Sequence, residues 1–306
     1  MTTTLIAEQL LNGLQFGLML FLIAAGLTLV FGIMDVLNLA HGSLYMVGAY
    51  VAASVAQASG SFWIALPVAV IATGLVGLLL ETALIRHLYR RDHLAQVLAT
   101  FAVILIADDT VKLVWGPAPL MLSAPAALAG PIEIVPGMLY PSYRLLIIGV
   151  GLALALALYL FVTKTRTGML VRAGSSNRDM ARLMGVRVDR LFATIFVLGA
   201  MLSAVAGALL GPLLAVEIGM GENILILALV VIVIGGIGSI RGAFVGAILV
   251  GVVDTAGRAF LPDLLNHFLA TAVAAQLGPA LAAIAIYVLM AAVLFLRPQG
   301  LFPARG

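Results

Sequence analysis

The chain has 306 residues, of which 63% are hydrophobic and only 9% are charged. A soluble domain carries about a quarter charged residues and roughly half apolar ones, so a chain this apolar must meet lipid over most of its surface. It contains no cysteine, which excludes disulfide bonds, thiolate metal sites and a catalytic cysteine. The composition therefore predicts a polytopic membrane protein.

Long apolar runs divide the chain into candidate membrane-spanning helices. A run of about 20 apolar residues is long enough to cross the hydrocarbon core, and the runs here are continuous rather than alternating. We expect one all-α transmembrane bundle over residues 1–306, with about 8–10 spans. The expected helices cover residues 10–33, 43–58, 62–84, 94–114, 143–162, 191–214, 222–238, 242–257 and 278–296.

The basic residues indicate which loops face the cytoplasm. They gather at residues 86–93, at residues 164–190 and near the end of the chain, whereas residues 115–143 contain no Lys or Arg. Positively charged loops stay on the cytoplasmic side, so the first three segments are predicted to face inward and 115–143 outward, with the N-terminus outside. The outward loop holds six of the 12 prolines, and we expect an ordered connection there because proline stiffens extended chain.

Sequence motifs for covalent chemistry are absent. The chain has no G-x-x-x-x-G-K-[ST] phosphate loop, no H-E-x-x-H zinc motif and no G-x-S-x-G nucleophile elbow, and its four histidines are scattered. The basic residues flank the predicted spans, so topology explains them without nucleic acid. We therefore expect a chain that is not an enzyme, has no nucleotide site of its own and needs no cofactor or metal.

The long inward segment, residues 163–191, is predicted to carry a short amphipathic helix. Ser176 followed by Asp179 fits a capping box, and Met180, Leu183 and Met184 then recur on one face. Gly185 stands where a helix would end in a left-handed turn. Two interpretations remain open: a helix that lies on the membrane interface or under the bundle, and a helix that docks a partner, for which methionine is well suited.

Three stretches of the chain resemble signatures of the branched-chain amino acid ABC transporter permeases. N-L-A-H-G-S-L-Y-M-V-G-A-Y, from Asn38 to Tyr50, is similar to the N-terminal signature of the family, and G-G-I-G-S-I-R-G-A, from Gly235 to Ala243, to the C-terminal one. G-M-L-V-R-A-G-S-S-N-R-D-M-A-R-L-M-G-V-R-V-D-R resembles the loop that contacts the ATPase. Arg241 departs from the pattern, because relatives often carry proline or a small residue there.

The resemblance implies an import complex in a bacterial inner membrane. Two permease subunits, identical or different, lie over two separate ATPase subunits, and a periplasmic binding protein delivers the substrate. Substrate crosses by alternating access when ATP binding moves the loop at residues 164–190. The residues that would couple to the ATPase are Arg178, Met180, Ala181, Leu183, Met184 and Gly185.

Polar residues between two apolar runs suggest a substrate pathway. Asp35, Asn38, His41 and Ser43 fit a helix break that turns polar groups inward, as transporters do at substrate sites. A cytoplasmic turn with Asn38 as a helix cap explains the same residues, and the charge-based topology favours that location. A second helix break is expected at Gly235, Gly236, Gly238 and Ser239. Close packing of helix backbones is the alternative explanation for these glycines.

Charged residues inside the predicted spans look structural. Spacing on a helix and proximity to a helix end predict three pairs, which are Asp108 with Lys112, Asp254 with Arg258, and Glu81 with Arg86. Asp109 has no obvious partner, so an ion-coupled transporter that works alone remains a rival function, while a membrane-embedded enzyme is disfavoured by the missing motifs. The same scaffold also resembles permeases for urea and short amides, so the substrate stays open.

Overall fold

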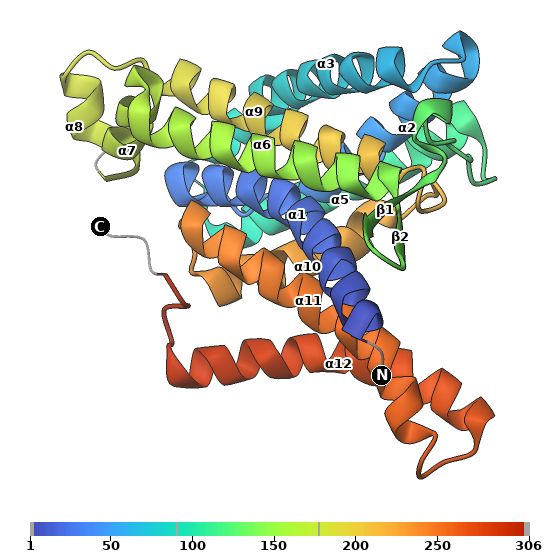
Figure 1. Cartoon of the computed structure of the whole chain (residues 1–306). Helices are drawn as coiled ribbons and strands as arrows, with labels where there is room; N and C mark the ends of the chain where they lie inside the picture. Colours follow the sequence, from blue (N-terminus) through green and yellow to red (C-terminus); the bar gives the residue numbers. More distant parts are fainter. Residues whose placement is uncertain (1–2, 90, 177, 303–306) are drawn as a thin grey trace.

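A computed structural model describes residues 3–89, 91–176 and 178–302, and it is a bundle of helices (Figure 1). Each of the nine predicted spans coincides with a helix, which confirms the all-α fold. These helices are α1 (Thr3–Met34), α2 (His41–Ser59), α3 (Phe62–Leu80), α5 (His93–Trp115), α6 (Ser142–Lys164), α9 (Val188–Leu210), α10 (Met220–Gly235), α11 (Ile240–Leu265) and α12 (Thr271–Leu296).

Length and apolar composition single out six segments of the described chain that could cross a membrane. They are Thr4–Met34, Phe62–Leu88, Ser142–Lys164, Val188–Leu210, Ile240–Leu265 and Thr271–Leu296. Helix α10 is apolar but shorter, and α2 and α5 are the two other helices at predicted spans. The structure thus establishes a multi-pass protein, and the count of nine spans remains a prediction.

Several helix ends differ from the predicted ones. Helices α1 and α12 begin seven residues earlier than expected, and α11 runs on to Leu265 instead of ending at 257. Helix α10 ends at Gly235, because Gly236 takes a left-handed φ of 104° that an α-helix cannot contain. Hydropathy locates the apolar middle of a helix well, but polar flanking turns that continue the helix leave little signal.

Helix α1 forms the centre of the bundle. The stretch from Leu18 to Ala25 is entirely buried, and α6, α9, α10 and α11 pack around it (Figure 1). A glycine permits the close crossing with α11, since a Cβ on Gly17 would lie 2.8 Å from the carbonyl oxygen of Ala247. Small residues allow this approach in membrane proteins, where packing rather than hydrophobic exclusion drives helix association.

The two ends of the bundle carry different accessory elements (Figure 1). At one end, β1 (Pro131–Val135) pairs antiparallel with β2 (Met138–Pro141), after a short 3₁₀ turn, η2 (Ala126–Leu128). At the other end lie α7 (Arg166–Ser176) and α8 (Arg178–Leu183). The hairpin was not predicted, although the dipeptide Pro136-Gly137 at its turn is a strong turn signal.

Candidate functional site

A break in the helical backbone separates α1 from α2. Asp35 has a left-handed φ of 53°, residues 36–40 are not helical, and α2 begins at His41. The N-cap of α2 is Ala40 rather than Asn38, so the predicted capping role of Asn38 is wrong. The Asn38 side chain instead accepts a hydrogen bond from the backbone N–H of Ala40 at 3.1 Å and stabilises the turn itself.

Helix α5 supplies hydrogen-bond partners for this broken backbone. The N–H of Leu37 donates to Oε1 of Gln96 at 3.1 Å, and the N–H of Leu39 donates to Oγ1 of Thr100 at 3.2 Å. Irregular backbone deep in a membrane protein requires such partners, because lipid offers none. Sequence reasoning missed Gln96 and Thr100, yet two polar residues four apart on an apolar helix share one face and could have signalled this contact.

His41 lies deep in the bundle and not in a turn at its end, which corrects the location that charge favoured. It is fully buried, and its Nε2 lies 2.8 Å from Oγ of Ser203, in the middle of α9. Two glycines make room for the ring: a Cβ on Gly26 would lie 2.6 Å from Nε2, and one on Gly199 would lie 3.2 Å from Cε1. The imidazole therefore fills a gap where α1 crosses α9.

Two side-chain nitrogens at this break make no hydrogen bond in the described part of the chain. They are Nδ1 of His41 and Nδ2 of Asn38, and both side chains are buried. A buried polar atom without a partner costs free energy. Buried polar atoms without a partner are uncommon in proteins, so these two nitrogens make the break a candidate for a polar path through the bundle.

Ser43 lies two residues farther along α2, in a crevice between α2, α5 and α10. Asp108 and Glu222 line the same crevice, and Gly42 and Gly221 close it, since a Cβ on Gly42 would collide with the carbonyl oxygen of Gly221. Asp108 faces Glu222 here instead of pairing with a lysine of its own helix. The expected Asp108–Lys112 pair is thus wrong for the described residues, whose ion pairs are Glu81–Arg86, Arg182–Asp189 and Asp254–Arg258.

The glycine-rich stretch after α10 is a tight, covered turn. Gly236 and Gly238 have left-handed φ angles of 104° and 79°, and Oγ of Ser239 caps α11 by accepting from the N–H of Gly242 at 3.1 Å. The predicted second helix break is therefore present. The C-terminal segment covers it, because the N–H of Phe302 donates to the carbonyl of Gly235 at 2.9 Å, and the crevice beside Ser43 does not include it.

Arg241, which departs from the family pattern, links two helices. Its guanidinium lies 5.5 Å from the ring centre of Tyr159 on α6, and its Nη2 donates to the Tyr159 hydroxyl at 3.2 Å. A cation over an aromatic ring is attracted to the negative face of the ring. Arg241 thus ties the first turn of α11 to α6.

Helix α8 presents the predicted apolar stripe to the outside. Met180, Leu183 and Met184 are 57%, 83% and 79% exposed, whereas Ala181 is buried. Gly185 has a φ of 85°, and hydrogen bonds from Gly185 to Arg182 and from Val186 to Ala181 form the predicted left-handed helix end. The side chains of Ser176, Arg178 and Asp179 lie outside the described residues, so the capping box and the role of Arg178 stay predictions.

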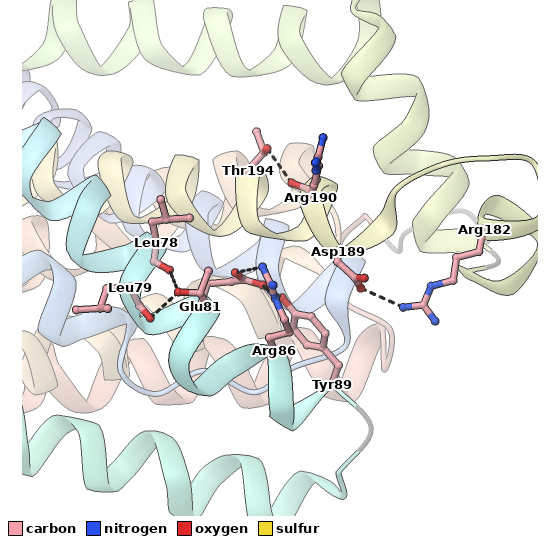
Figure 2. A network of polar contacts seen from close by, with 10 residues as sticks. Leu78, Leu79, Glu81, Arg86, Tyr89, Arg182, Asp189, Arg190 and Thr194 are labelled. Carbon is pink, nitrogen blue, oxygen red and sulfur yellow. Dashed lines mark hydrogen bonds and ion pairs between the residues drawn. The ribbon is translucent and has the colours of Figure 1, made fainter.

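A polar network lies beside α8 and fixes the end of α3 (Figure 2). A π-helical turn, η1 (Glu81–Ile85), leads from α3 into α4 (Arg86–Leu88) and places Glu81 in the interior. Its carboxylate accepts from Arg86 Nη2 at 3.0 Å and from the Tyr89 hydroxyl at 2.6 Å, which confirms the expected Glu81–Arg86 pair. Burial, and then the bond to Glu81, raise the pKa of Tyr89, so its hydroxyl stays a donor.

The same network reaches α8 through α9. The ring of Tyr89 packs edge-on against Phe192 of α9 at 5.2 Å between centroids, and Arg182 of α8 pairs with Asp189, in the first turn of α9, at 3.2 Å. A groove of about 570 Å³ lies beside these groups, and four of its eight lining residues are arginines. Helix α8 is therefore connected to α9 and, through α9, to the end of α3.

Comparison with known proteins agrees with this architecture. The family model described as branched-chain amino acid transport system / permease component matches residues 9–296. LivH of Salmonella typhimurium, a high-affinity branched-chain amino acid transport system permease protein, is 30% identical over 269 residues, which cover 83% of this chain and 86% of the relative. BraD of Pseudomonas aeruginosa, which carries the same description, is 29% identical over 84% of this chain and 87% of its own length.

A relative of slightly lower identity aligns with a similar share of the chain. The probable branched-chain amino acid transport permease protein LivH of Methanocaldococcus jannaschii is 28% identical over 83% of this chain and 79% of its own length. No solved structure matches the chain. Because the family model spans nearly the whole chain and the relatives align along most of their length, the chain belongs to the permease-component family of branched-chain amino acid transport systems.

Proposed function

We propose that this permease is the membrane-spanning subunit of an ABC importer in a bacterial inner membrane, with branched-chain amino acids as its substrates. The family match over residues 9–296 carries this proposal, and the substrate class follows from the names of the relatives. Urea or a short amide is the alternative substrate class within the same scaffold. The chain catalyses no covalent step and needs no cofactor.

The proposed partners are a second permease subunit, two ATPase subunits and a periplasmic binding protein. The exposed stripe of α8 supports an ATPase partner, because three large apolar side chains face outward at the end of the bundle where α7 and α8 lie. An exposed apolar stripe on a polar helix is typical of a docking surface. Met180, Ala181, Leu183, Met184 and Gly185 form or shape this surface, and Arg178 belongs to it by sequence.

The connections of α8 suggest how ATP binding would reach the bundle. A partner that moves α8 would also shift the first turn of α9, because only residues 184–187 separate the two helices and Arg182 pairs with Asp189 beside this connection. Helix α9 carries Ser203, the hydrogen-bond partner of His41. Displacement of one rigid helix can thus change the surroundings of the break between α1 and α2, which is the kind of two-state element that alternating access requires.

We propose that the substrate path runs past Asn38, His41 and Ser43. The unpartnered nitrogens of Asn38 and His41 support this path, as does the crevice at Ser43, which is closed in this conformation. A role of the second break in the path is supported only by its broken backbone. Packing against the C-terminal segment explains that backbone equally well. The residues of this break are Gly235, Gly236, Gly238 and Ser239.

The proposed complex can be tested by isolating it from native membranes. The chain is extracted in mild detergent, and mass spectrometry identifies the proteins that remain bound. A co-purifying ATPase and a second permease chain would support the proposal, and an attached binding protein would point to the substrate. Recovery of the chain alone, under conditions that keep other ABC complexes intact, would contradict it.

A pair of variants tests the docking surface in the same experiment. Leu183→Asp places a charge in the exposed stripe of α8, so we expect loss of the ATPase from the complex and loss of uptake. Met169→Asp is the matched control, because Met169 is 54% exposed on the neighbouring α7, and it should keep both. Equal effects of the two variants would argue against α8 as the docking helix.

A further inference from the structure

The arginine-lined groove beside α8 lies at the ends of two candidate membrane spans. Phe62–Leu88 ends two residues after Arg86, and Val188–Leu210 begins directly after Arg187. At 1.5 Å per residue, the 23 residues of α9 cover about 34 Å, slightly more than a hydrocarbon core of about 30 Å. The groove is therefore level with the lipid headgroups, on the side that the basic loops assign to the cytoplasm.

Two of the four arginines in this groove have their charge balanced by the chain itself. Arg86 pairs with the buried carboxylate at the end of α3, and Arg182 pairs with Asp189, the one acidic residue of the lining. Arg187 and Arg190 are both exposed, and neither belongs to an ion pair within the described part of the chain. The groove thus offers two guanidinium groups to an anion from outside the chain.

A second groove, of about 510 Å³, adjoins the first, and Arg187 and Arg190 line both. Most of its other side chains are apolar, and they include Leu170 of α7 and Leu191 of α9. Its lining also reaches Thr194, one turn farther along α9 than Arg190 and so deeper in the membrane (Figure 2). The two guanidinium groups therefore stand beside apolar surface that extends toward the hydrocarbon core.

An anionic phospholipid has the chemistry that this combination requires. A guanidinium donates parallel hydrogen bonds to two phosphate oxygens, so arginine is well suited to bind a phosphate ester. Basic pockets between membrane helices on the cytoplasmic side bind anionic lipid headgroups. The acyl chain of such a lipid covers apolar surface next to its phosphate, whereas inorganic phosphate has no apolar part. At this depth the membrane supplies both parts in one molecule.

We propose that Arg187 and Arg190 bind the phosphate of an anionic phospholipid from the cytoplasmic leaflet, and that one of its acyl chains lies against Leu170 and Leu191. The lipid fills the space between α7 and the start of α9. It therefore stabilises the place where α8 joins the bundle. This site does not depend on which substrate the permease carries or on which protein contacts α8.

Native mass spectrometry of the chain, purified in detergent with the subunits that remain bound to it, tests this site. The delipidated sample is titrated with phosphatidylglycerol, and zwitterionic phosphatidylcholine is the reference lipid. Arg187→Gln together with Arg190→Gln should weaken phosphatidylglycerol binding about 30-fold, since each basic residue near an anionic lipid surface contributes roughly fivefold. The matched control is Arg91→Gln together with Lys164→Gln. It removes the same charge from exposed residues that line neither groove, so the affinity should stay unchanged.

The groove variant is expected to fold, because both arginine side chains are exposed and Arg187 precedes α9 without a side-chain cap. A monodisperse size-exclusion peak checks this expectation. If the double variant does not fold, Arg190→Gln alone replaces it and should weaken binding about fivefold.

Several results would overturn the proposal. Equal weakening by the groove pair and the control pair would indicate a general attraction to basic loops instead of a site. Equal binding of the two lipids would show that the groove does not recognise an anionic headgroup. Binding of inorganic phosphate as tight as that of phosphatidylglycerol would assign the arginines to a free anion. Loss of a bound protein subunit from the groove variant, with lipid binding unchanged, would assign them to a protein contact.

Discussion

Replacement of Gln96 by leucine should destabilise the break between α1 and α2. The amide of Gln96 accepts from the N–H of Leu37 at 3.1 Å and donates to the carbonyls of Leu88 and Arg91 at 3.2 and 3.1 Å. The Leu88 carbonyl keeps another donor, the N–H of Arg91, so the main cost is the stranded N–H of Leu37. A fully buried unsatisfied donor costs about 1–3 kcal/mol. The N–H of Leu37 is only partly buried, so we expect the lower end of this range, about 1 kcal/mol, and a melting temperature lower by roughly 2–4 °C.

The assay is the loss of the monodisperse size-exclusion peak on heating the detergent-extracted complex. Gln57→Leu is the matched control, because the Gln57 side chain is exposed and makes one long hydrogen bond of 3.5 Å, so its melting temperature should change little. A second variant, Thr100→Val, strands the N–H of Leu39 in the same way and should show a similar loss. If Gln96→Leu melts with the control, the segment at 35–40 does not depend on α5, and the reasoning fails.

Three further substitutions probe the other contacts. Ser203→Ala removes the hydrogen bond to the buried imidazole and should lower the stability of the bundle by about 0.6–1.7 kcal/mol. Thr194→Ala, in an exposed turn of the same helix, is the control in the same melting assay. Equal effects of the two variants would argue against the buried bond. Glu81→Ala leaves the guanidinium of Arg86 and the phenol of Tyr89 without their shared buried acceptor. It should therefore lower the melting temperature far more than Asp189→Ala, which breaks an exposed pair. A larger effect of Asp189→Ala would contradict the network. Asp109→Asn should keep ATP-driven uptake in membrane vesicles, and loss of uptake from an intact complex would favour ion coupling instead.

The sequence predicted the positions of the helices because hydropathy is a local property. Each apolar run is contiguous, so all nine expected segments coincide with a helix. The end of α8 at Gly185 could also be predicted, since the left-handed turn depends only on residues within one turn of it. The Glu81–Arg86 and Asp254–Arg258 pairs were predictable for the same reason, because their partners are four or five residues apart.

The candidate site depended on contacts that sequence spacing does not reveal. His41 and Ser203 are 162 residues apart, and Leu37 and Gln96 are 59 apart. The sequence showed that polar groups lie between two apolar runs, but it favoured a cytoplasmic turn because charge patterns describe only the loops. The Asp108–Lys112 pair failed similarly, since helical spacing permits a pair and cannot show that Asp108 lines a crevice with Glu222 of another helix.

By itself, the sequence determined that the chain is a multi-pass helical membrane protein of a recognisable transporter family, because composition, apolar runs and short signatures are all contiguous. Only the tertiary structure decided how deep His41 lies, which residues satisfy the broken backbone and which arginines of the groove beside α8 have an ion pair. These properties depend on how helices cross. Crossing is set by glycines such as Gly26 and Gly199 on different helices, whose mutual approach appears only when the whole bundle is assembled.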